Sequence, residues 1–472
     1  MIFRFKLFFV FLILLPLFSI SKEKEVILKG NIPGYTNKEI TFLTYDDQIT
    51  YTEKKLCSTS VNENGEFTCS FNIEKTTYVF LHLGIYEAFI FVEPGKTYEL
   101  LFPEIKEKQL IDELNPYFQP LLYHLGIENT SENELNYQLA LFDEIYSKMI
   151  NENAYLIYSK SNKLNVDLEL NKIDSIFNNF DHPFFNDFKK YRFASFRHLS
   201  YQEKMKSISN TYYLNKEILY LNPAYMELFN QVYDEYFQYF GRTNYGKKIY
   251  KDIGELKSIT SLKNTLGEDS VLTNDTLKEL VILKCLHDEF YNDDFSRAAM
   301  LVVLDSLTIQ TKIPEHRKIA QNIRTKVTKL MVGFKPPAFN LYNKDSILVS
   351  LDSFRGQYVY LGFCTTVSYA CIQEFDKLQR LHELHKNHYE IVVISMDESL
   401  DNMKDFVEKK GYDYTFLHYG NQPEVFKDYD IRAFPTYYFI DKEGRLSMSP
   451  APAPDENLEQ YIFKILKEAG EL

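Results

Sequence analysis

The stretch Leu361–Cys371, LGFCTTVSYAC, decides the fold of the C-terminal third of this 472-residue chain. A turn signal at Gly356 precedes it, and an apolar run begins at Tyr358. After it, apolar residues recur every three or four positions through Leu378, the spacing of a helix with one buried face. The stretch therefore predicts a strand, a loop and then a helix that starts close to Cys371.

This corner resembles the active-site loop of the thioredoxin superfamily, and most closely the exported TlpA/ResA-like proteins related to AhpC/TSA. In that family a strand and an aromatic residue lead into Trp-Ala-Thr-Trp and then Cys-x-x-Cys. The resemblance puts Cys364 at the position of the first Trp, Ser368 at that of the nucleophilic Cys and Cys371 at that of the second Cys. The motif here is therefore Ser-x-x-Cys.

Further segments in the same order extend the resemblance over residues 334–472, and we expect an α/β thioredoxin-like domain there. One of them, a long apolar run, is typical of a strand buried on both faces. The segments are the proline-rich entry Lys335–Leu341, Val349–Phe354, the apolar run Glu390–Asp397, a helix over Asp401–Lys410, a strand at Thr415–His418, the Pro-Thr turn within Arg432–Asp441, and a last helix from about Glu456.

The resemblance also implies a binding edge at the Pro-Thr turn. Pro435 is expected to follow a cis peptide bond, in a turn that faces the active-site loop. In the family, backbone groups of the residue before this proline, here Phe434, pair with a bound polypeptide strand. The candidate substrate-binding residues are Tyr369, Phe434, Pro435 and Thr436.

Thiol–disulfide exchange needs an exposed thiolate that attacks and a second thiol that resolves the mixed disulfide. Ser368 cannot form a disulfide, and nothing nearby in the sequence suggests a base that would activate its hydroxyl. Cys371 would lie in the first helical turn, where the helix dipole favours a thiolate, although a buried, inert thiol is the alternative. Cys364 could pair with Cys371 if their Cα atoms come within about 7 Å.

Two functions therefore compete, and whether the chain is an enzyme stays open. The first is a redox-inactive or weakly active module that binds a polypeptide through the Phe434–Pro435 turn. The second is a thiol–disulfide oxidoreductase that works through Cys371, alone or with Cys364. The first is favoured because the standard nucleophile is missing. We expect no cofactor. His382, His385 and His388 recur at spacings of three, and two of them could share a face and bind a metal, but no carboxylate or Cys partner is evident. We therefore expect a solvated helix end and no metal site.

The N-terminus resembles a targeting segment. Arg4 and Lys6 precede the apolar run Leu7–Ile20, and small residues follow it, which predicts a secretory signal peptide at residues 1–21. The run is shorter than the about 20 residues of a stable transmembrane helix. We therefore predict export to the periplasm or cell envelope, with no stable membrane span in the mature protein. A net charge of −13 argues against a nucleic-acid partner.

Residues 22–103 change to short alternating runs separated by turn signals. They predict an antiparallel β-domain of about seven strands, similar to the small β-domain often found ahead of such thioredoxin-like domains. Cys57 and Cys69 flank the Asn64–Gly65 turn. If the flanking strands form a hairpin, these cysteines are one step out of register, and a bulge would have to bring them opposite each other. A Cys57–Cys69 disulfide and two half-buried thiols both stay open.

Residues 104–333 are expected to be helical and show no catalytic signature. The clearest helix spans Asn222–Phe240, with Asn222 as its cap and Gly241 as its stop. Its aromatic stripe at spacings of three or four predicts a core-facing side rather than a ligand groove. The chain is thus expected to be multidomain, with an N-terminal antiparallel β-domain, a central all-α region and the C-terminal α/β domain.

Overall fold

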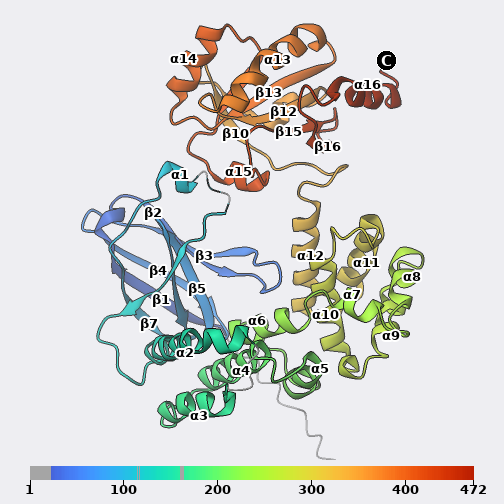
Figure 1. Cartoon of the computed structure of the whole chain (residues 1–472). Helices are drawn as coiled ribbons and strands as arrows, with labels where there is room; N and C mark the ends of the chain where they lie inside the picture. The colour runs from blue at the N-terminus through green and yellow to red at the C-terminus, as the bar shows by residue number, and fades with distance from the viewer. Residues whose placement is uncertain (1–22, 114, 116, 160–163, 472) are drawn as a thin grey trace, which may run out of the picture.

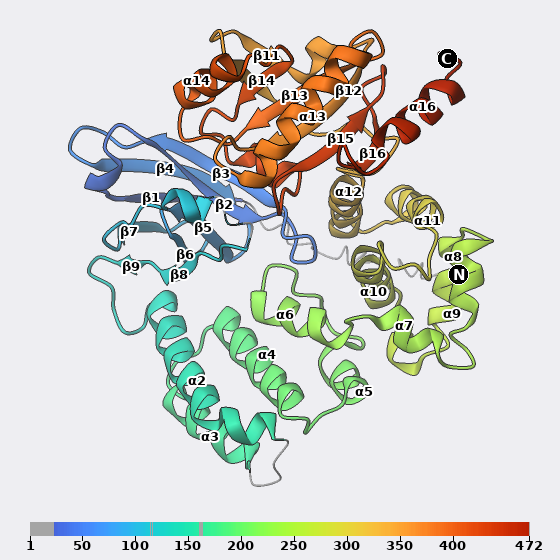
Figure 2. The same ribbon diagram turned by 45° about the horizontal axis from the view of Figure 1, so that its top comes forward.

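The computed structural model describes residues 23–113, 115, 117–159 and 164–471. The expected signal peptide, residues 1–21, lies outside this part of the chain. Figure 1 shows the N-terminal strands on one side, the middle helices below and beside them, and the C-terminal α/β domain above both. Figure 2 shows the same division from a second direction. The expected order of a β-domain, a helical region and an α/β domain is confirmed.

The β-domain consists of two sheets, in the strand orders β4-β1-β7-β9 and β3-β2-β5-β6-β8. Most pairs are antiparallel as expected, but β1 pairs with β7 and β6 with β8 in parallel. Two short strands lie beyond residue 103, so the sheets include part of the region assigned to helices. The strands are β1 (Lys24–Asn31), β2 (Glu39–Tyr45), β3 (Glu53–Ser60), β4 (Glu66–Ile73), β5 (Thr77–Leu83), β6 (Tyr86–Val92), β7 (Thr97–Leu101), β8 (Leu121–His124) and β9 (Gly126–Ile127).

The Asn64–Gly65 turn joins two different sheets, so the expected hairpin pairing of its flanking strands is wrong. Asn62 donates its backbone N–H to the carbonyl of Glu66 at 2.9 Å within the turn. Beyond the turn, β3 and β4 are edge strands of two separate sheets. The reason is visible in β4, where alternate residues are buried. That alternation turns one face of β4 toward the opposite sheet, and the apolar residues of the two sheets share one core.

The middle region is built from helices, most of them beneath and beside the β-sheets in Figure 1. They are α2 (Leu135–Tyr158), α3 (Val166–Ile176), α4 (Pro183–Leu199), α5 (Met205–Ile208), α6 (Pro223–Val232), α7 (Tyr236–Gly241), α8 (Lys248–Gly254), α9 (Ile259–Leu266), α10 (Asp275–Asp288), α11 (Arg297–Gln310) and α12 (Pro314–Thr328), with the short α1 (Leu110–Glu113) preceding β8. Figure 2 shows α2, α4 and α6 below the β-domain and α12 rising toward the C-terminal domain.

The helix expected over Asn222–Phe240 is two helices, α6 and α7. Asn222 caps the first as expected, since its side chain accepts from the backbone N–H of Tyr225 at 3.2 Å. The break comes at Glu235, whose φ of 46° is left-handed. A second acceptor then starts α7, because the Glu289 carboxylate accepts from the backbone N–H of Phe237 at 3.0 Å. The stripe nevertheless lies in the core as expected: Tyr225, Phe229, Val232, Tyr236 and Phe240 are all buried.

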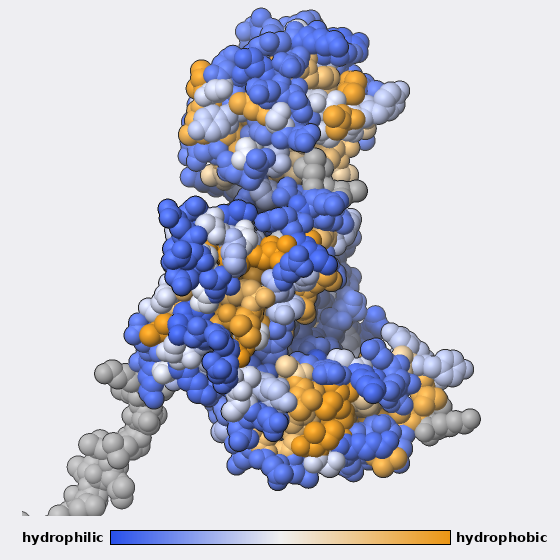
Figure 3. Space-filling model, turned by 90° about the vertical axis from the view of Figure 1, so that its left-hand side faces the viewer, coloured by the Kyte–Doolittle hydropathy of each residue, from blue (hydrophilic) through white to orange (hydrophobic). Residues whose placement is uncertain are grey.

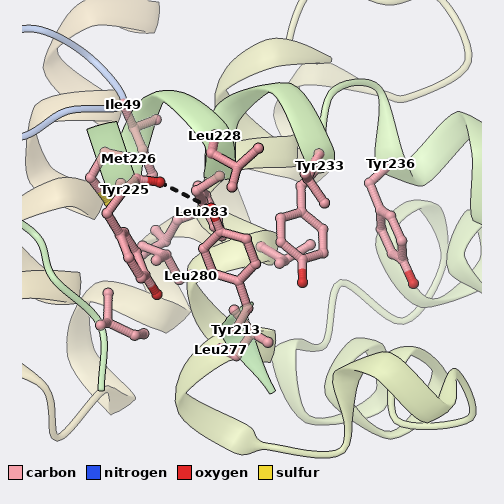
Figure 4. Packing of buried hydrophobic residues seen from close by; sticks show 14 of the residues in the cluster. Ile49, Tyr213, Tyr225, Met226, Leu228, Tyr233, Tyr236, Leu277, Leu280 and Leu283 are labelled. Carbon is pink, nitrogen blue, oxygen red and sulfur yellow. Dashed lines mark hydrogen bonds between the residues drawn. The ribbon is translucent and has the colours of Figure 1, made fainter. Parts of the chain in front are cut away.

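The β-domain and the helical region are packed together. Figure 4 shows Ile49, from the loop after β2, beside Met226 in the helical core. The Asp47 carboxylate holds that loop by accepting from the backbone N–H groups of Ile49 and Thr50 at 2.8 and 2.7 Å. Asn322 of α12 donates to the same carboxylate at 2.8 Å. These contacts fix the loop between the two regions.

The C-terminal domain has a seven-stranded sheet in the order β11-β10-β14-β13-β12-β15-β16. The β13, α14 and β14 elements match the expected segments, and the thioredoxin-like fold is confirmed. Its elements are β10 (Asn340–Asn343), β11 (Leu348–Ser350), β12 (Tyr358–Cys364), α13 (Tyr369–His385), β13 (Tyr389–Ser395), α14 (Leu400–Lys410), β14 (Thr415–His418), α15 (Glu424–Asp428), β15 (Thr436–Ile440), β16 (Leu446–Ala451) and α16 (Leu458–Glu468). Apolar clusters fill both faces of this sheet.

The surface seen in Figure 3 is mostly polar, with apolar residues gathered over the β-domain and the helices below it. Within the described ranges, no helix combines the length and the apolar character that a bilayer span requires.

Candidate functional site

The corner where β12 ends and α13 begins brings Cys364, Ser368 and Cys371 together. Cys364 is the last residue of β12, and Ser368 is the cap residue before α13. Both cysteines are fully buried, and both are free thiols that hydrogen-bond each other. The backbone N–H of Thr365 also donates to Cys371 Sγ at 3.4 Å. The corner thus holds a reduced, enclosed pair of thiols.

The two thiols have opposite acidities. The hydrogen bond from Cys364 lowers the pKa of Cys371 to about 7 against the effect of burial, with help from the Thr365 N–H and from Ser368. Burial raises the pKa of Cys364 well above its ordinary value, and the Cys371 sulfur raises it further. As the pH rises, Cys371 therefore ionises first, while Cys364 stays protonated and donates to it.

The accessible side of the motif offers a hydroxyl group. Ser368 is half-buried, and its neighbours Val367 and Tyr369 are 85% and 75% exposed. The thiols lie behind this edge, with no exposed surface of their own. A partner that approaches the corner would meet Ser368 and two large side chains before it could reach sulfur.

The Pro-Thr turn lies beside the same corner. The Phe434–Pro435 peptide bond is cis, and Thr436 pairs with Phe363, one residue before Cys364. Phe434, Pro435 and Thr436 are half-buried. The structure thus brings the turn to the end of β12, next to the strand that leads into the Ser-x-x-Cys motif.

The turn also lies near the β-domain. Arg432, two residues before Phe434, hydrogen-bonds Tyr117 in the segment that precedes β8. The ammonium group of Lys329, directly after α12, lies 2.5 Å from the carboxylate of Asp428 in α15. The C-terminal domain is therefore seated on the rest of the chain by polar contacts close to the turn.

Sequence reasoning missed Asp397, which anchors the loop between Cys364 and Ser368. Its buried carboxylate accepts from the Thr365 hydroxyl at 2.9 Å, from the Thr366 N–H at 2.9 Å and from the Thr366 hydroxyl at 2.8 Å. The Ser395 hydroxyl donates to its second oxygen. The available signal was an acid directly after the apolar run of β13, because strand ends meet at the active edge of an α/β sheet.

Glu374 and Tyr437 were also missed, and both lie behind the thiols. Glu374 is buried one helical turn after Cys371. Its Oε1 accepts from Lys377 at 2.8 Å, while its Oε2 has no hydrogen-bond partner among the described residues. Tyr437 is buried with its hydroxyl against Cys364, and burial, then the Cys364 sulfur, raise its pKa. The helical spacing of three from Cys371 to Glu374 could have indicated the first of these residues.

The other cysteine and histidine candidates lie away from the corner. Cys57 and Cys69 form a disulfide in the β-domain, with Cα atoms 6.2 Å apart. His382 Nε2 lies 3.7 Å from Asp413, and His385 Nε2 lies 2.6 Å from Glu459. In the part of the chain that the structure describes, no group of three or more His, Cys, Asp and Glu could hold a metal ion.

Comparisons with known proteins concern the C-terminal part of the chain. The model of the AhpC/TSA family matches residues 332–449. The thiol-disulfide oxidoreductase ResA of Bacillus thuringiensis subsp. konkukian is 30% identical over 148 residues, which cover 31% of this chain and 84% of that protein. ResA of Geobacillus thermodenitrificans is 26% identical over 149 residues, 31% of this chain and 85% of the relative.

Among solved structures, a putative thiol-disulfide oxidoreductase from Bacteroides vulgatus aligns at 21% identity with a TM-score of 0.28. The alignment covers 29% of this chain and 99% of that one. The sequence relationship to ResA extends over most of the relative's length. The residues matched by the AhpC/TSA model include the Ser-x-x-Cys corner and the Pro-Thr turn. Through its C-terminal domain, the chain therefore belongs to the thioredoxin-like, TlpA/ResA-like thiol–disulfide oxidoreductases of the AhpC/TSA family.

Proposed function

We propose that this chain is an exported thioredoxin-like protein that binds a polypeptide and carries out little or no thiol–disulfide exchange. One observation carries the proposal. The accessible position of the motif is Ser368, while Cys364 and Cys371 are both fully buried. Exchange begins with attack by an exposed thiolate on a disulfide sulfur, and a serine hydroxyl cannot take that role.

The geometry of the turn supports polypeptide binding. Phe434 precedes Pro435 beside the corner, and exposed Val367 and Tyr369 border the same edge. Because proline has no N–H, a partner strand would pair through the backbone of Phe434. Each such hydrogen bond contributes only about 1 kcal/mol net, so specificity would come from side chains such as Tyr369. The partner would be held without a covalent bond and released readily.

Binding at this edge can be tested by pull-down from cell-envelope extract. Wild type is compared with Pro435→Ala and Tyr369→Ala, and with Tyr461→Ala as a matched control on α16, where Tyr461 is 52% exposed. We expect Pro435→Ala and Tyr369→Ala to lose partners that wild type and the control retain. Equal recovery by all four proteins would place polypeptide binding elsewhere.

A second candidate function rests on the hydrogen-bonded thiols. Cys371 has a pKa lowered to about 7, chiefly by Cys364, and Cys364 can supply the second thiol. In this reading the Cys371 thiolate attacks a substrate disulfide and one substrate sulfur leaves as a thiol. Cys364 then displaces the other, which forms a Cys364–Cys371 disulfide and leaves the substrate as a dithiol. The corner would first have to open, because both sulfurs are enclosed.

A disulfide-reduction assay separates the two candidates. We expect wild type to be no faster than an equal concentration of free thiol. The Ser368→Cys variant should gain measurable activity, because it restores an exposed thiol at the start of α13, where the helix dipole favours a thiolate. Robust wild-type activity that Cys371→Ala abolishes would instead support the second candidate.

Export is supported by the signal-like N-terminus and by the Cys57–Cys69 disulfide, because disulfides persist in oxidising compartments. N-terminal sequencing of protein isolated from the native envelope tests it. We expect cleavage between about Ser19 and Lys22. Intact Met1 on protein recovered from the membrane would contradict a cleaved signal peptide.

A further inference from the structure

A cavity of about 690 Å³ lies between the β-domain and the helical region, remote in sequence from the Ser-x-x-Cys corner. Its walls come from β3, the ends of β2 and β4 with the loops that follow them, the start of α4, the segment Ile218–Asn222 and the start of α12. Ligand-binding pockets have volumes of roughly 300–1,000 Å³ and occur preferentially between domains. The size and place of this cavity are those of a binding site.

One wall carries Tyr220, whose hydroxyl is fixed by a buried chain of polar groups. The Tyr220 oxygen lies 2.8 Å from His316 Nε2, and His316 Nδ1 lies 2.9 Å from Glu279 Oε1. His316 is fully buried and Glu279 nearly so. Thr311 and Lys263 also donate to the Glu279 carboxylate. These hydrogen bonds hold the Tyr220 side chain in one position in the cavity wall.

The chain of hydrogen bonds ends in an ionised carboxylate. Burial opposes ionisation of Glu279, but hydrogen bonds from His316, Lys263 and Thr311 outweigh it and lower its pKa to about 2, so it accepts. The His316 ring bridges the two groups, because Nδ1 donates its hydrogen to the ionised Glu279 and Nε2 hydrogen-bonds the hydroxyl of Tyr220. Burial, together with Glu315 and Glu279, raises the pKa of Tyr220, so the phenol keeps its proton. Whichever way the bond to His316 runs, the Tyr220 oxygen keeps a lone pair that can accept a hydrogen bond from a further donor.

The charges around the cavity favour a positively charged ligand. The lining contains five acidic residues and three lysines: Asp46, Asp47, Glu74, Asp187, Glu315, Lys54, Lys75 and Lys318. Lys318 is already paired with Asp46 at 3.2 Å. Asp187 and Glu315 form no ion pair with any residue in the described ranges, and Glu315 acts on Tyr220 electrostatically. An acceptor hydroxyl beside an unpaired carboxylate is suited to an ammonium or guanidinium group.

The lining also contains apolar residues that are held in place by packing. Ile218, Met226 and Ile319 are buried residues of the helical core, and Ile73 closes the β-domain side. The segment Asp46–Gln48, just before Ile49, also lines the cavity, and Figure 4 shows Ile49 packed beside Met226. An apolar side chain next to the cationic group would bury against these residues.

We propose that this cavity binds a short segment of polypeptide in which an apolar residue adjoins a lysine or arginine. β3, which lines the cavity through Lys54 and Leu56, is the last strand of its sheet, so an extended chain can pair with its outer edge. A small amine would use only the polar corner and leave the strand edge and the apolar lining unused. The proposal is independent of the Phe434–Pro435 turn.

The absence of tryptophan from the sequence provides a direct test. Leu221 lines the cavity next to Tyr220 and is 39% exposed, so Leu221→Trp places a single reporter there. The probes are the blocked tetrapeptide Leu-Lys-Val-Leu, the same peptide with Glu in place of Lys, and butylamine. We expect the lysine peptide to shift the tryptophan emission and to release heat on titration into unmodified wild type, which does not depend on the reporter.

Two substitutions then test the polar corner. Tyr220→Phe and Glu315→Gln should each weaken binding of the lysine peptide about fivefold. That is the loss of affinity expected when one hydrogen-bond acceptor or one partly exposed charge is removed. The matched controls Tyr245→Phe and Glu268→Gln lie on exposed positions away from the cavity and should leave affinity unchanged. Equal affinity for the lysine and glutamate peptides, butylamine binding as tightly as the peptide, or the absence of both emission change and heat would each overturn the proposal.

Discussion

Two pairs of cysteines in this chain lie in contrasting surroundings. Cys57 and Cys69 are joined by a disulfide that links two sheets of the β-domain, while Cys364 and Cys371 remain thiols within one strand–helix corner. β3 and β4 lie in separate sheets, so the disulfide supplies the link that a strand ladder would otherwise give. The corner is already held by hydrogen bonds to Asp397.

The comparison shows how a thioredoxin-like corner can persist without its nucleophile. Its loop is positioned by Asp397 and by the packing of Cys364 and Cys371 into the core, and neither depends on a cysteine at position 368. Ser368 begins α13 in place of that cysteine. The fold of the corner can therefore be kept without a cysteine at position 368.

The largest effect is expected from Asp397→Ala, which removes the anchor of the corner. The substitution leaves the donors of Thr365, Thr366 and Ser395 without their acceptor in a buried site. Unsatisfied buried donors are costly, and the free energy of unfolding of the C-terminal domain should fall by about 4 kcal/mol. Denaturant unfolding followed by circular dichroism measures it.

The adjacent acid gives a matched control. Glu398 is exposed, and Glu398→Ala should change the free energy of unfolding by no more than about 0.5 kcal/mol. If Asp397→Ala were as mild as this control, the loop would be held mainly by packing, and the contrast between the two cysteine pairs would lose its basis.

A somewhat smaller effect is expected from removing the disulfide. The Cys57→Ala/Cys69→Ala double variant opens a loop with a sequence separation of 12, for which chain-entropy estimates give about 3 kcal/mol of lost stability. Thermal or denaturant unfolding of the whole chain measures the loss in the β-domain. Reductant should lower the stability of wild type toward that of the variant.

The control is the double variant itself treated with reductant, which should show no further loss. A wild-type protein that is insensitive to reductant and contains five titratable thiols when unfolded would show that the pair is not oxidised. Both cysteine pairs would then be thiols, and the contrast in their redox state would disappear.

Much of the fold follows from local sequence pattern. The apolar run of β13 and the period of α14 predicted their elements to within a residue or two, because burial on both faces of a sheet leaves a continuous signal. The break between α6 and α7 was not predictable. It depends on Glu289, which lies more than fifty positions along the chain from Glu235 and supplies an acceptor that only the folded chain brings near.

The candidate site was predictable where it depends on order along the chain. Cys364, Ser368 and Cys371 were placed at one corner from the motif alone, and the structure brings them together. The sheet change at the Asn64–Gly65 turn was missed because a tight turn looks the same whether its strands pair or diverge. Asp397 and Tyr437 were missed because their roles depend on neighbours from other strands, whereas Glu374 lies on the same helix as Cys371 and could have been found from its helical spacing.

The smallest effect concerns the acidity of the buried pair. Because hydrogen bonding from Cys364 lowers the pKa of Cys371 to about 7, a thiolate should form in the folded protein as the pH rises through about 7. The folded pKa lies below the unfolded value, so this group stabilises the fold most fully at pH values above its unfolded pKa. That contribution is lost as the pH falls through about 7. Thiolate ultraviolet absorbance between about pH 6 and pH 9 follows the titration.

Three variants assign that titration to the pair. Cys371→Ser should abolish the step, since burial holds the pKa of both Cys364 and Cys285 well above the ordinary value. Cys364→Ala should move the midpoint upward, because the hydrogen bond from Cys364 is the largest cause of the lowered pKa of Cys371. Cys364→Ser retains a donor at the same place and should leave the midpoint closer to that of wild type. If Cys364→Ala and wild type titrate alike, the two thiols do not act as a pair, and the second candidate function loses its resolving thiol.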